Sequence, residues 1–215
     1  LILLYDQDLD RYIEFNFNPE VFEPIPVYGC SVFSKVKRDL KTEGLVVHKT
    51  NMPSSKATIT KTKDKEHSHA NIRTCILSGL NPKLVIDYSN VELAFSGKKK
   101  LVMPHKMYGF PFIDKTGIYG ISNRDSYVIE SDDIDYLERL SQFFSTKTSL
   151  YLFEATRYRM KYLEKYVFQV IPDICKLAGF PNDITDDTIA DYFGFTDQER
   201  KAISELHTKK YTFTY

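Results

Sequence analysis

The sequence predicts an α+β protein in which a curved, mostly antiparallel sheet subdomain is followed by a C-terminal group of helices. Short apolar runs, alternating or rich in β-branched residues and separated by polar connections, fill the chain up to about residue 130. From residue 131 onward, apolar residues recur at helical spacing, and hydroxyl or acidic residues stand where the helices would begin. We therefore expect a strand-rich subdomain over residues 1–130 and a helical subdomain over residues 131–215.

Composition limits the classes of function. The 215 residues carry 29 Lys and Arg against 29 Asp and Glu, so a nucleic-acid surface would have to come from local clustering of charge. Three cysteines, Cys30, Cys75 and Cys175, are far apart and odd in number, which fits a reducing, cytoplasmic compartment. No apolar run approaches the roughly 20 residues of a membrane span. The chain opens with LILLYDQDLD, without an initiator Met or a signal peptide, which suggests a C-terminal piece of a longer protein.

Several segments have the alternation or β-branched content of strands, bounded by turn residues. The predicted strands cover residues 1–4, 12–17, 45–47, 57–60, 72–77, 84–88, 101–103, 118–121 and 127–129. A short amphipathic helix is expected over residues 32–40, with Gly44 as a left-handed cap. Between the last two strands, residues 122–125 (Ser-Asn-Arg-Asp) are predicted to form a tight hairpin turn.

The C-terminal part should contain two longer helices and two short capped ones. Ser131 is a suitable N-cap for a helix that runs to about Phe144, and a second helix is expected over residues 150–168, ending before Pro172. In that second helix a basic row would lie beside a row of tyrosines. Thr185 should cap a short helix, and Thr196 with Glu199 forms a capping box for another. The alternating tail, residues 211–215, suggests a final strand.

Motifs for catalysis are lacking in the sequence. It contains no Gly-rich dinucleotide or phosphate loop and no Gly-x-Ser-x-Gly elbow. Asp87 and Glu92 come nearest to a nuclease cluster, but Ala94 occupies the position that a lysine would need. His67 and His69 have no third metal ligand nearby, so we expect no metal site. The chain alone is therefore not expected to be an enzyme.

Four stretches in a fixed order carry a family resemblance. They are KKKLVMPHKMYGFPFID, GISNRDSYVI, YLERLSQFFSTKTSLYLFEATRYRMKYLEKYVFQVIPDI and ITDDTIADYFGFTDQERKAI. This order resembles the C-terminal target-recognition region of N6-adenine DNA methyltransferases of type IIG and type I-like restriction–modification systems. The resemblance covers residues 98–203 and includes phrases like Phe143-Phe144-Ser145-Thr146-Lys147 and Ile171-Pro172-Asp173-Ile174.

The resemblance implies a division of labour. A separate N-terminal methyltransferase domain of the parent protein would bind S-adenosylmethionine and methylate adenine, and a nuclease is sometimes fused to it. Asn81-Pro82-Lys83 departs from the family's catalytic motif at the second proline, so this chain would need no cofactor. Its partners would be double-stranded DNA and that methyltransferase domain.

The residue chemistry is compatible with DNA recognition. Lysines can hold phosphates, whereas an Arg or Asn side chain can pair with base edges in the major groove. The alternative role of Asn123 is that of a turn residue, and the alternative role of the lysine triplet is protection of an edge strand. The residues expected to contact DNA are Lys98, Lys99, Lys100, His105, Lys106, Tyr108, Asn123, Arg124, Lys147, Arg157, Arg159 and Lys161.

A second hypothesis belongs to another class. The predicted helix over residues 150–168 is rich in tyrosine and arginine, which are enriched at protein–protein interfaces. The chain would then be a docking module rather than a DNA-binding one. A nuclease with an unrecognised active site is a third hypothesis.

Overall fold

The computed structural model describes residues 1–18, 23–37, 44–78, 81–106, 110–124, 126–158 and 162–206. The chain forms two compact units. Unit 1 combines Leu1–Leu45 with the chain from Gln142, and unit 2 is Val46–Ser141. This division differs from the sequential split at residue 130 that the sequence predicts, because the C-terminal helices pack with the N-terminal segment.

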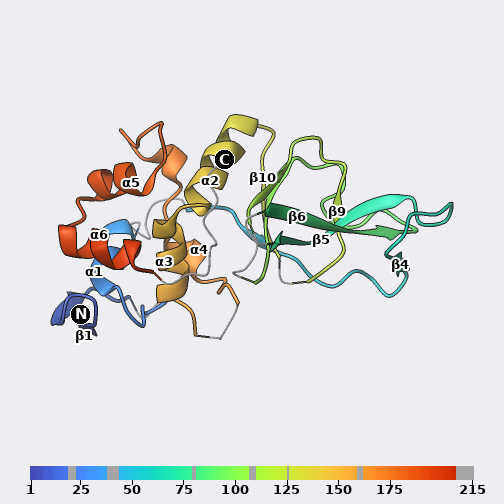
Figure 1. Ribbon diagram of the computed structural model, residues 1–215. Helices are drawn as coiled ribbons and strands as arrows, with labels where there is room; N and C mark the ends of the chain where they lie inside the picture. Colours follow the sequence, from blue (N-terminus) through green and yellow to red (C-terminus); the bar gives the residue numbers. More distant parts are fainter. Residues whose placement is uncertain are drawn as a thin grey trace. The chain divides into compact units, whose positions relative to one another are not determined.

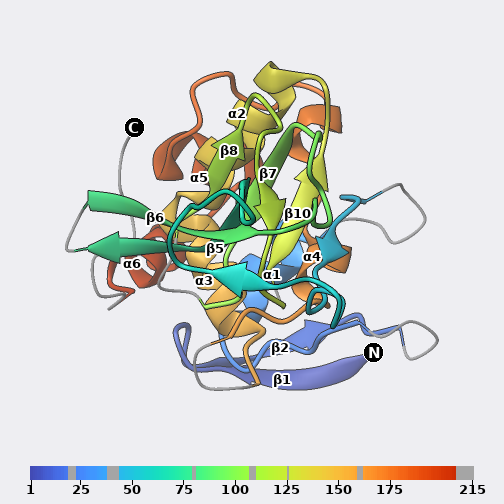
Figure 2. The same cartoon turned by 90° about the vertical axis from the view of Figure 1, so that its right-hand side faces the viewer.

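Unit 2 is built on two four-stranded sheets, with the strand orders β3-β10-β7-β8 and β4-β6-β5-β9. Figure 2 shows β7, β8 and β10 of the first sheet side by side. Strand pairing is antiparallel except for β5 with β9, which is parallel. The strands are β3 His48–Lys49, β4 Ile59–Thr60, β5 His69–Ser78, β6 Asn81–Ser89, β7 Lys100–Met103, β8 Phe112–Asp114, β9 Gly120–Ile121 and β10 Tyr127–Glu130.

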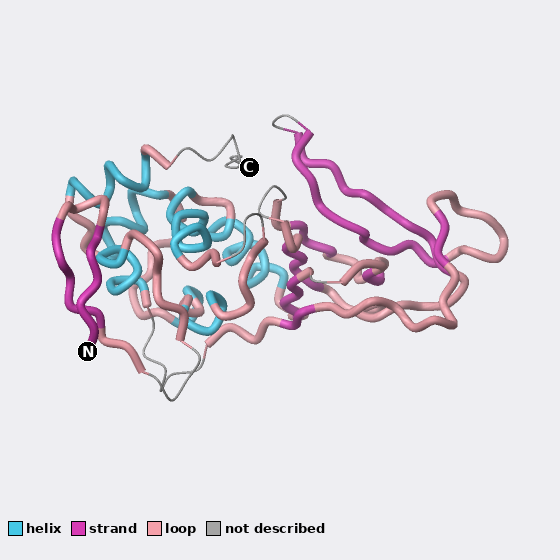
Figure 3. The backbone as a smooth tube through the Cα atoms, turned by 90° about the horizontal axis from the view of Figure 1, so that it is seen from below, coloured by secondary structure: helices cyan, strands magenta, loops and turns pink. Residues whose placement is uncertain are grey.

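The long hairpin of β5 and β6 dominates the second sheet (Figure 3). Its strands contain the two apolar runs from which they were predicted. Ile72 pairs with Ile86 and Cys75 with Leu84, so apolar side chains meet across the ladder on one face. The register shifts between Ile72 and Thr74, which marks a bulge at Arg73.

The predicted hairpin through residues 122–125 is wrong. β9 joins β5 in one sheet, whereas β10 lies between β3 and β7 in the other, so residues 122–126 cross from sheet to sheet. Thr50 stabilises this crossover through hydrogen bonds to Asn123 and to Ser126. Its hydroxyl donates to the Asn123 carbonyl (2.9 Å) and accepts from the Ser126 N–H (2.9 Å), and its own N–H donates to the Ser126 carbonyl (2.8 Å).

Unit 1 begins with a two-stranded hairpin, β1 Ile2–Asp6 and β2 Arg11–Phe15. Helix α1, Cys30–Val36, contacts both strands and α3. Its N-cap is Gly29, which has no side chain, so the buried Asp6 of β1 caps the helix by accepting from the Ser31 N–H (2.9 Å). The Asp6 carboxylate thus links the N-terminal hairpin to the first turn of α1 by a hydrogen bond.

The remaining elements of the chain are mostly helical (Figure 1). Helix α2 begins after Asp133, whose carboxylate accepts from the Tyr136 N–H (3.1 Å); Ser131 bonds to the Asp133 N–H instead and is not the cap. The capping boxes at Thr185 and at Thr196 are confirmed. The helices are α2 Ile134–Phe144, α3 Lys147–Ala155, α4 Val167–Val170, the 3₁₀ helix η1 Ile174–Lys176, α5 Asp186–Phe193 and α6 Asp197–Ser204.

The predicted helix over residues 150–168 is wrong. Helix α3 ends at Ala155, and helical structure in the described chain resumes only at Val167. Thr156 accounts for the end, because its hydroxyl donates back to the Leu152 carbonyl (3.0 Å) while its backbone leaves the helical conformation. The expected rows of tyrosine and basic side chains therefore do not share a helix.

Phenylalanine supplies much of the core of unit 1. Phe144, Phe153 and Phe168 form a triangle of rings with centroids 5.5–6.1 Å apart, and Phe143 contacts Phe144 and Phe180. All five side chains are buried. These aromatic groups are thus committed to packing and are not available to stack on nucleic-acid bases.

Candidate nucleic-acid interface

The lysine triplet that opens β7 divides into surface and core. Lys98 is exposed, with its ammonium 3.8 Å from Glu130, and Lys99 is half-buried. Lys100 is fully buried and donates to the Asp114 carboxylate (2.7 Å) and to the Lys98 carbonyl (2.9 Å). The prediction that Lys100 contacts phosphate is therefore wrong, because its charge is already paired inside the protein.

Asp114 is the centre of this buried site. Besides Lys100, its carboxylate accepts from the N–H groups of Gly117 (2.8 Å) and Tyr119 (3.0 Å). Burial raises the pKa of Asp114, but the hydrogen bonds from Lys100, Tyr119 and Gly117 outweigh it, so the pKa is lowered overall. The ion pair thus fixes the loop that follows β8.

β7 is an interior strand, flanked by β10 on one side and β8 on the other. All four of its residues are buried. The alternative explanation of the lysines, protection of an edge strand, does not apply to this position.

The turn at Asn123 and Arg124 lies at the crossover between the two sheets. Arg124 is exposed and Asn123 is half-buried. The Asn123 side-chain oxygen accepts from the Arg124 N–H (3.0 Å), which is a local turn contact. Arg124 therefore keeps a position from which it can reach a ligand, while Asn123 has a structural role of its own.

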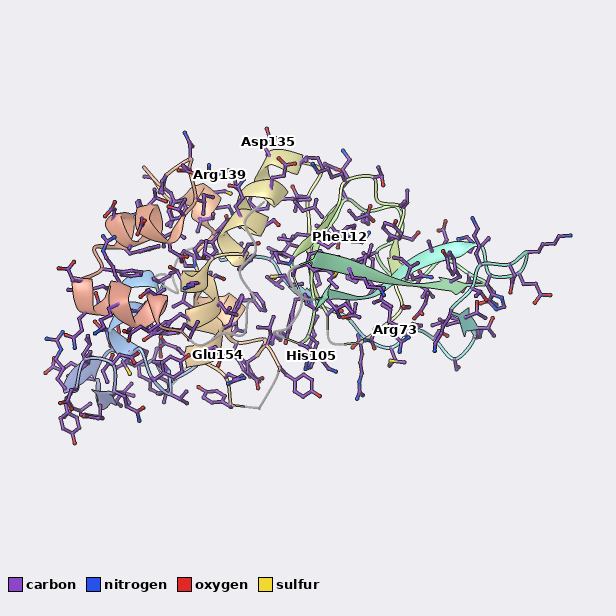
Figure 4. The ribbon with its side chains drawn as sticks, viewed as in Figure 1. Arg73, His105, Phe112, Asp135, Arg139 and Glu154 are labelled. Carbon is purple, nitrogen blue, oxygen red and sulfur yellow. The ribbon has the colours of Figure 1, made fainter. Side chains whose placement is uncertain are left out.

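The connection after β7 carries the next predicted residues. His105, labelled in Figure 4, is half-buried, and Lys106 is exposed. Tyr108 lies outside the described residues, as do Arg159, Lys161 and the tail predicted to be a strand, residues 211–215.

Lys147 and Arg157 belong to unit 1 and serve its internal packing. The Lys147 ammonium donates to the Ser204 carbonyl at the end of α6 (2.9 Å), and the Arg157 guanidinium lies 2.6 Å from the Glu154 carboxylate. The basic row predicted on one helix face does not include Arg157 in a helix, because α3 ends at Ala155.

A cavity of about 220 Å³ lies between α3, α5 and α6. Its polar lining is used to join these helices. The Asp186 carboxylate accepts from the Thr148 N–H and hydroxyl (2.7 Å each) and so caps α3 from α5. The residues that line the cavity are Lys147, Thr148, Asp186, Asp187, Ala190, Arg200, Ile203 and Ser204.

The sequence-based prediction missed a group of exposed lysines in unit 2. These lysines lie before and after β4. All are exposed, and no described residue forms an ion pair with any of them; they are Lys56, Lys61, Lys63 and Lys65. The signal that could have found them is the ratio of four lysines to two acids over residues 56–66.

Charge is distributed unevenly over the chain. Residues 46–130, which contain both sheets, carry 13 Lys and Arg against 7 Asp and Glu. The whole of unit 2, residues 46–141, carries 14 against 11, and the whole chain is neutral. Two of those acids, Asp87 and Asp114, are buried, and Asp87 lies 3.9 Å from Arg73, which is labelled in Figure 4. The solvent-facing part of this sheet region is therefore cationic, and this local excess suits a polyanion.

Comparisons with known proteins give no further support. No family model, curated protein or solved structure matches the chain. Among the described residues, no three His, Cys, Asp or Glu side chains gather to hold a metal ion. No described helix has the length and apolar character needed to cross a membrane.

Proposed function

We propose that this chain binds double-stranded DNA through unit 2. The observation that supports this proposal is the set of exposed lysines without ion pairs on a sheet region with a local excess of positive charge. Lysines of this kind can neutralise phosphates and release counterions, which makes binding fall with salt. Lys98, Lys99, Lys106 and Arg124 are the contacts that come from the sequence prediction.

The proposed division of labour follows the resemblance to target-recognition regions. Methyl transfer and S-adenosylmethionine would belong to a separate domain of an intracellular parent protein. Duplex binding is the part of the activity that this chain would supply. Within it, Lys98 and Lys99 would fix the register on phosphates, and Arg124 would read a base edge.

The test is fluorescence anisotropy of the full chain with labelled duplexes at several salt concentrations, after selection of a preferred sequence from a random pool. We expect the K98A/K99A variant to weaken binding to every duplex and to flatten the log–log salt dependence by about 1.8, from about 0.9 for each phosphate contact. We expect R124A to lose about 1–3 kcal/mol on the preferred duplex and little on random ones.

The matched control is K176A/K201A, which removes two exposed lysines from unit 1. Its binding should equal that of the wild type. Binding that is absent at low salt, or that does not change with salt, would contradict the proposal. Equal losses on preferred and random duplexes for R124A would exclude its role in reading bases.

A second candidate function is protein docking. Tyr158, Tyr162 and Tyr166 are 53%, 38% and 40% exposed, so tyrosines do reach the surface of unit 1 although they share no helix. Exposed tyrosines are typical of interfaces. Measured affinity of the chain for a DNA duplex would favour the first candidate, and no such affinity would favour protein docking.

A further inference from the structure

The connection between β4 and β5 is a compact turn. β4 pairs with the end of β6, where Ser89 also faces His69, so residues 61–68 lie at the end of the β5–β6 ladder that Ser89 and His69 form. This turn carries Lys61, Lys63 and Lys65, all exposed.

Asp64 and His67 organise the turn. The Asp64 carboxylate accepts from the N–H groups of Glu66 (2.9 Å) and His67 (2.7 Å), and the Asp64 N–H donates to the His67 carbonyl (3.3 Å). The His67 ring lies between the Asp64 carboxylate (3.0 Å at Nδ1) and the Thr58 hydroxyl (2.9 Å at Nε2). The turn is therefore closed by side chains on both sides of the lysines.

The order Thr58, His67, Asp64 is also that of a hydrolytic triad. A triad needs N–H groups free to receive an oxyanion. The N–H of Thr58 already donates to the Asn90 side chain (2.8 Å), and the Thr58 carbonyl accepts from the Asn90 N–H (3.3 Å). The hydroxyl, the ring and the carboxylate thus support the turn rather than a nucleophile.

The turn carries an excess of positive charge: Lys61, Lys63 and Lys65 stand against Asp64 and the exposed Glu66, a net charge of +1 with His67 neutral. The Asp64 carboxylate accepts hydrogen bonds within the turn, and those with the backbone N–H and the ring of His67 lower its pKa. No described residue forms an ion pair with Lys61, Lys63 or Lys65. Three ammonium groups are therefore held by an ordered backbone with their charges available to a ligand.

We propose that residues 61–67 form a prefolded turn that grips backbone phosphates of a duplex, as a second group of contacts besides Lys98 and Lys99. This inference rests on the proposed function and adds to it the place of further contacts. An ordered turn loses less conformational entropy on binding than a flexible lysine-rich loop. Because phosphate contacts carry no sequence information, the turn adds affinity to all duplexes alike.

The experiment compares three variants of the full chain on a random-sequence 20-base-pair duplex by anisotropy across a salt series. We expect K61A/K63A/K65A to flatten the log–log salt dependence by about 2.7, from about 0.9 for each contact. H67A keeps all three lysines but removes the ring that joins Asp64 to Thr58. It should weaken binding roughly fivefold, because the ring's two hydrogen bonds no longer order the turn before it binds, and leave the salt slope unchanged.

The matched control, K165A/K176A/K201A, removes three exposed lysines from unit 1 and should bind like the wild type. Wild-type binding with an unchanged salt slope in K61A/K63A/K65A would overturn the inference and leave the proposed function standing. An equal change in the control would also overturn it, because the effect would then be one of total charge. No binding by the wild type would overturn both proposals.

Discussion

Replacement of Lys100 by methionine tests whether the buried ion pair of Lys100 with Asp114 stabilises the core of unit 2. Met keeps the length and the apolar body of the side chain, so the change removes the charge without leaving a large cavity. The substitution leaves the Asp114 carboxylate, which is 2% exposed, without the ammonium group that lies 2.7 Å from it. Removing one member of a buried pair costs about 3–5 kcal/mol, a large part of the stability of a unit of about 100 residues.

The free energy of unfolding is measured in a urea titration that is monitored by hydrogen exchange at the amides of Gly117 and Tyr119. Both amides donate to Asp114, so they report on the stability of unit 2. The K98M variant is the matched control, because Lys98 is exposed and lies 3.8 Å from Glu130. Its free energy of unfolding should change by less than about 1 kcal/mol. K100M/D114N should lose less than K100M, since it leaves no unpaired charge.

The effect of K100M also depends on pH. Because the pKa of Asp114 is lowered in the folded protein, its stabilising effect is present above the ordinary carboxyl pKa and is lost as pH falls through the folded value. The gap between wild type and K100M should therefore be widest near neutral pH and close below about pH 4. A loss under about 1 kcal/mol at neutral pH, or an equal loss in K98M, would refute the buried ion pair.

Two further predictions concern unit 1. Gly29 has φ +61°, and an added Cβ would overlap the Tyr151 ring. Gly29→Ala should therefore lower the free energy of unfolding by about 2–4 kcal/mol, measured in urea titrations monitored by far-UV circular dichroism. Gly179→Ala, also at positive φ but with open space around it, should lower the free energy of unfolding less. Burial raises the pKa of Glu199, but Lys35, Ser31 and the Thr196 N–H outweigh it and lower the pKa overall, so the stability that Glu199 contributes should be lost as pH falls below about 4.3. E199Q should flatten that loss in thermal unfolding, whereas E205Q, at an exposed position, should leave it unchanged.

Local signals explain which parts of the fold could be predicted. The capping boxes at Thr185 and Thr196 need only residues three positions apart, and both form as the sequence indicates. The two apolar runs of β5 and β6 are close in sequence, so their pairing also follows from a short stretch of chain.

Contacts between distant residues decided the rest. Lys100 leaves the surface because Asp114, on the neighbouring strand, can pair with it in the core. The turn at Asn123 becomes a crossover because β9 finds β5, about 50 residues earlier, rather than its neighbour β10. Composition and spacing could show that lysines were present. Which of them face solvent was fixed only when strands distant in sequence came together and offered some of those charges a buried partner.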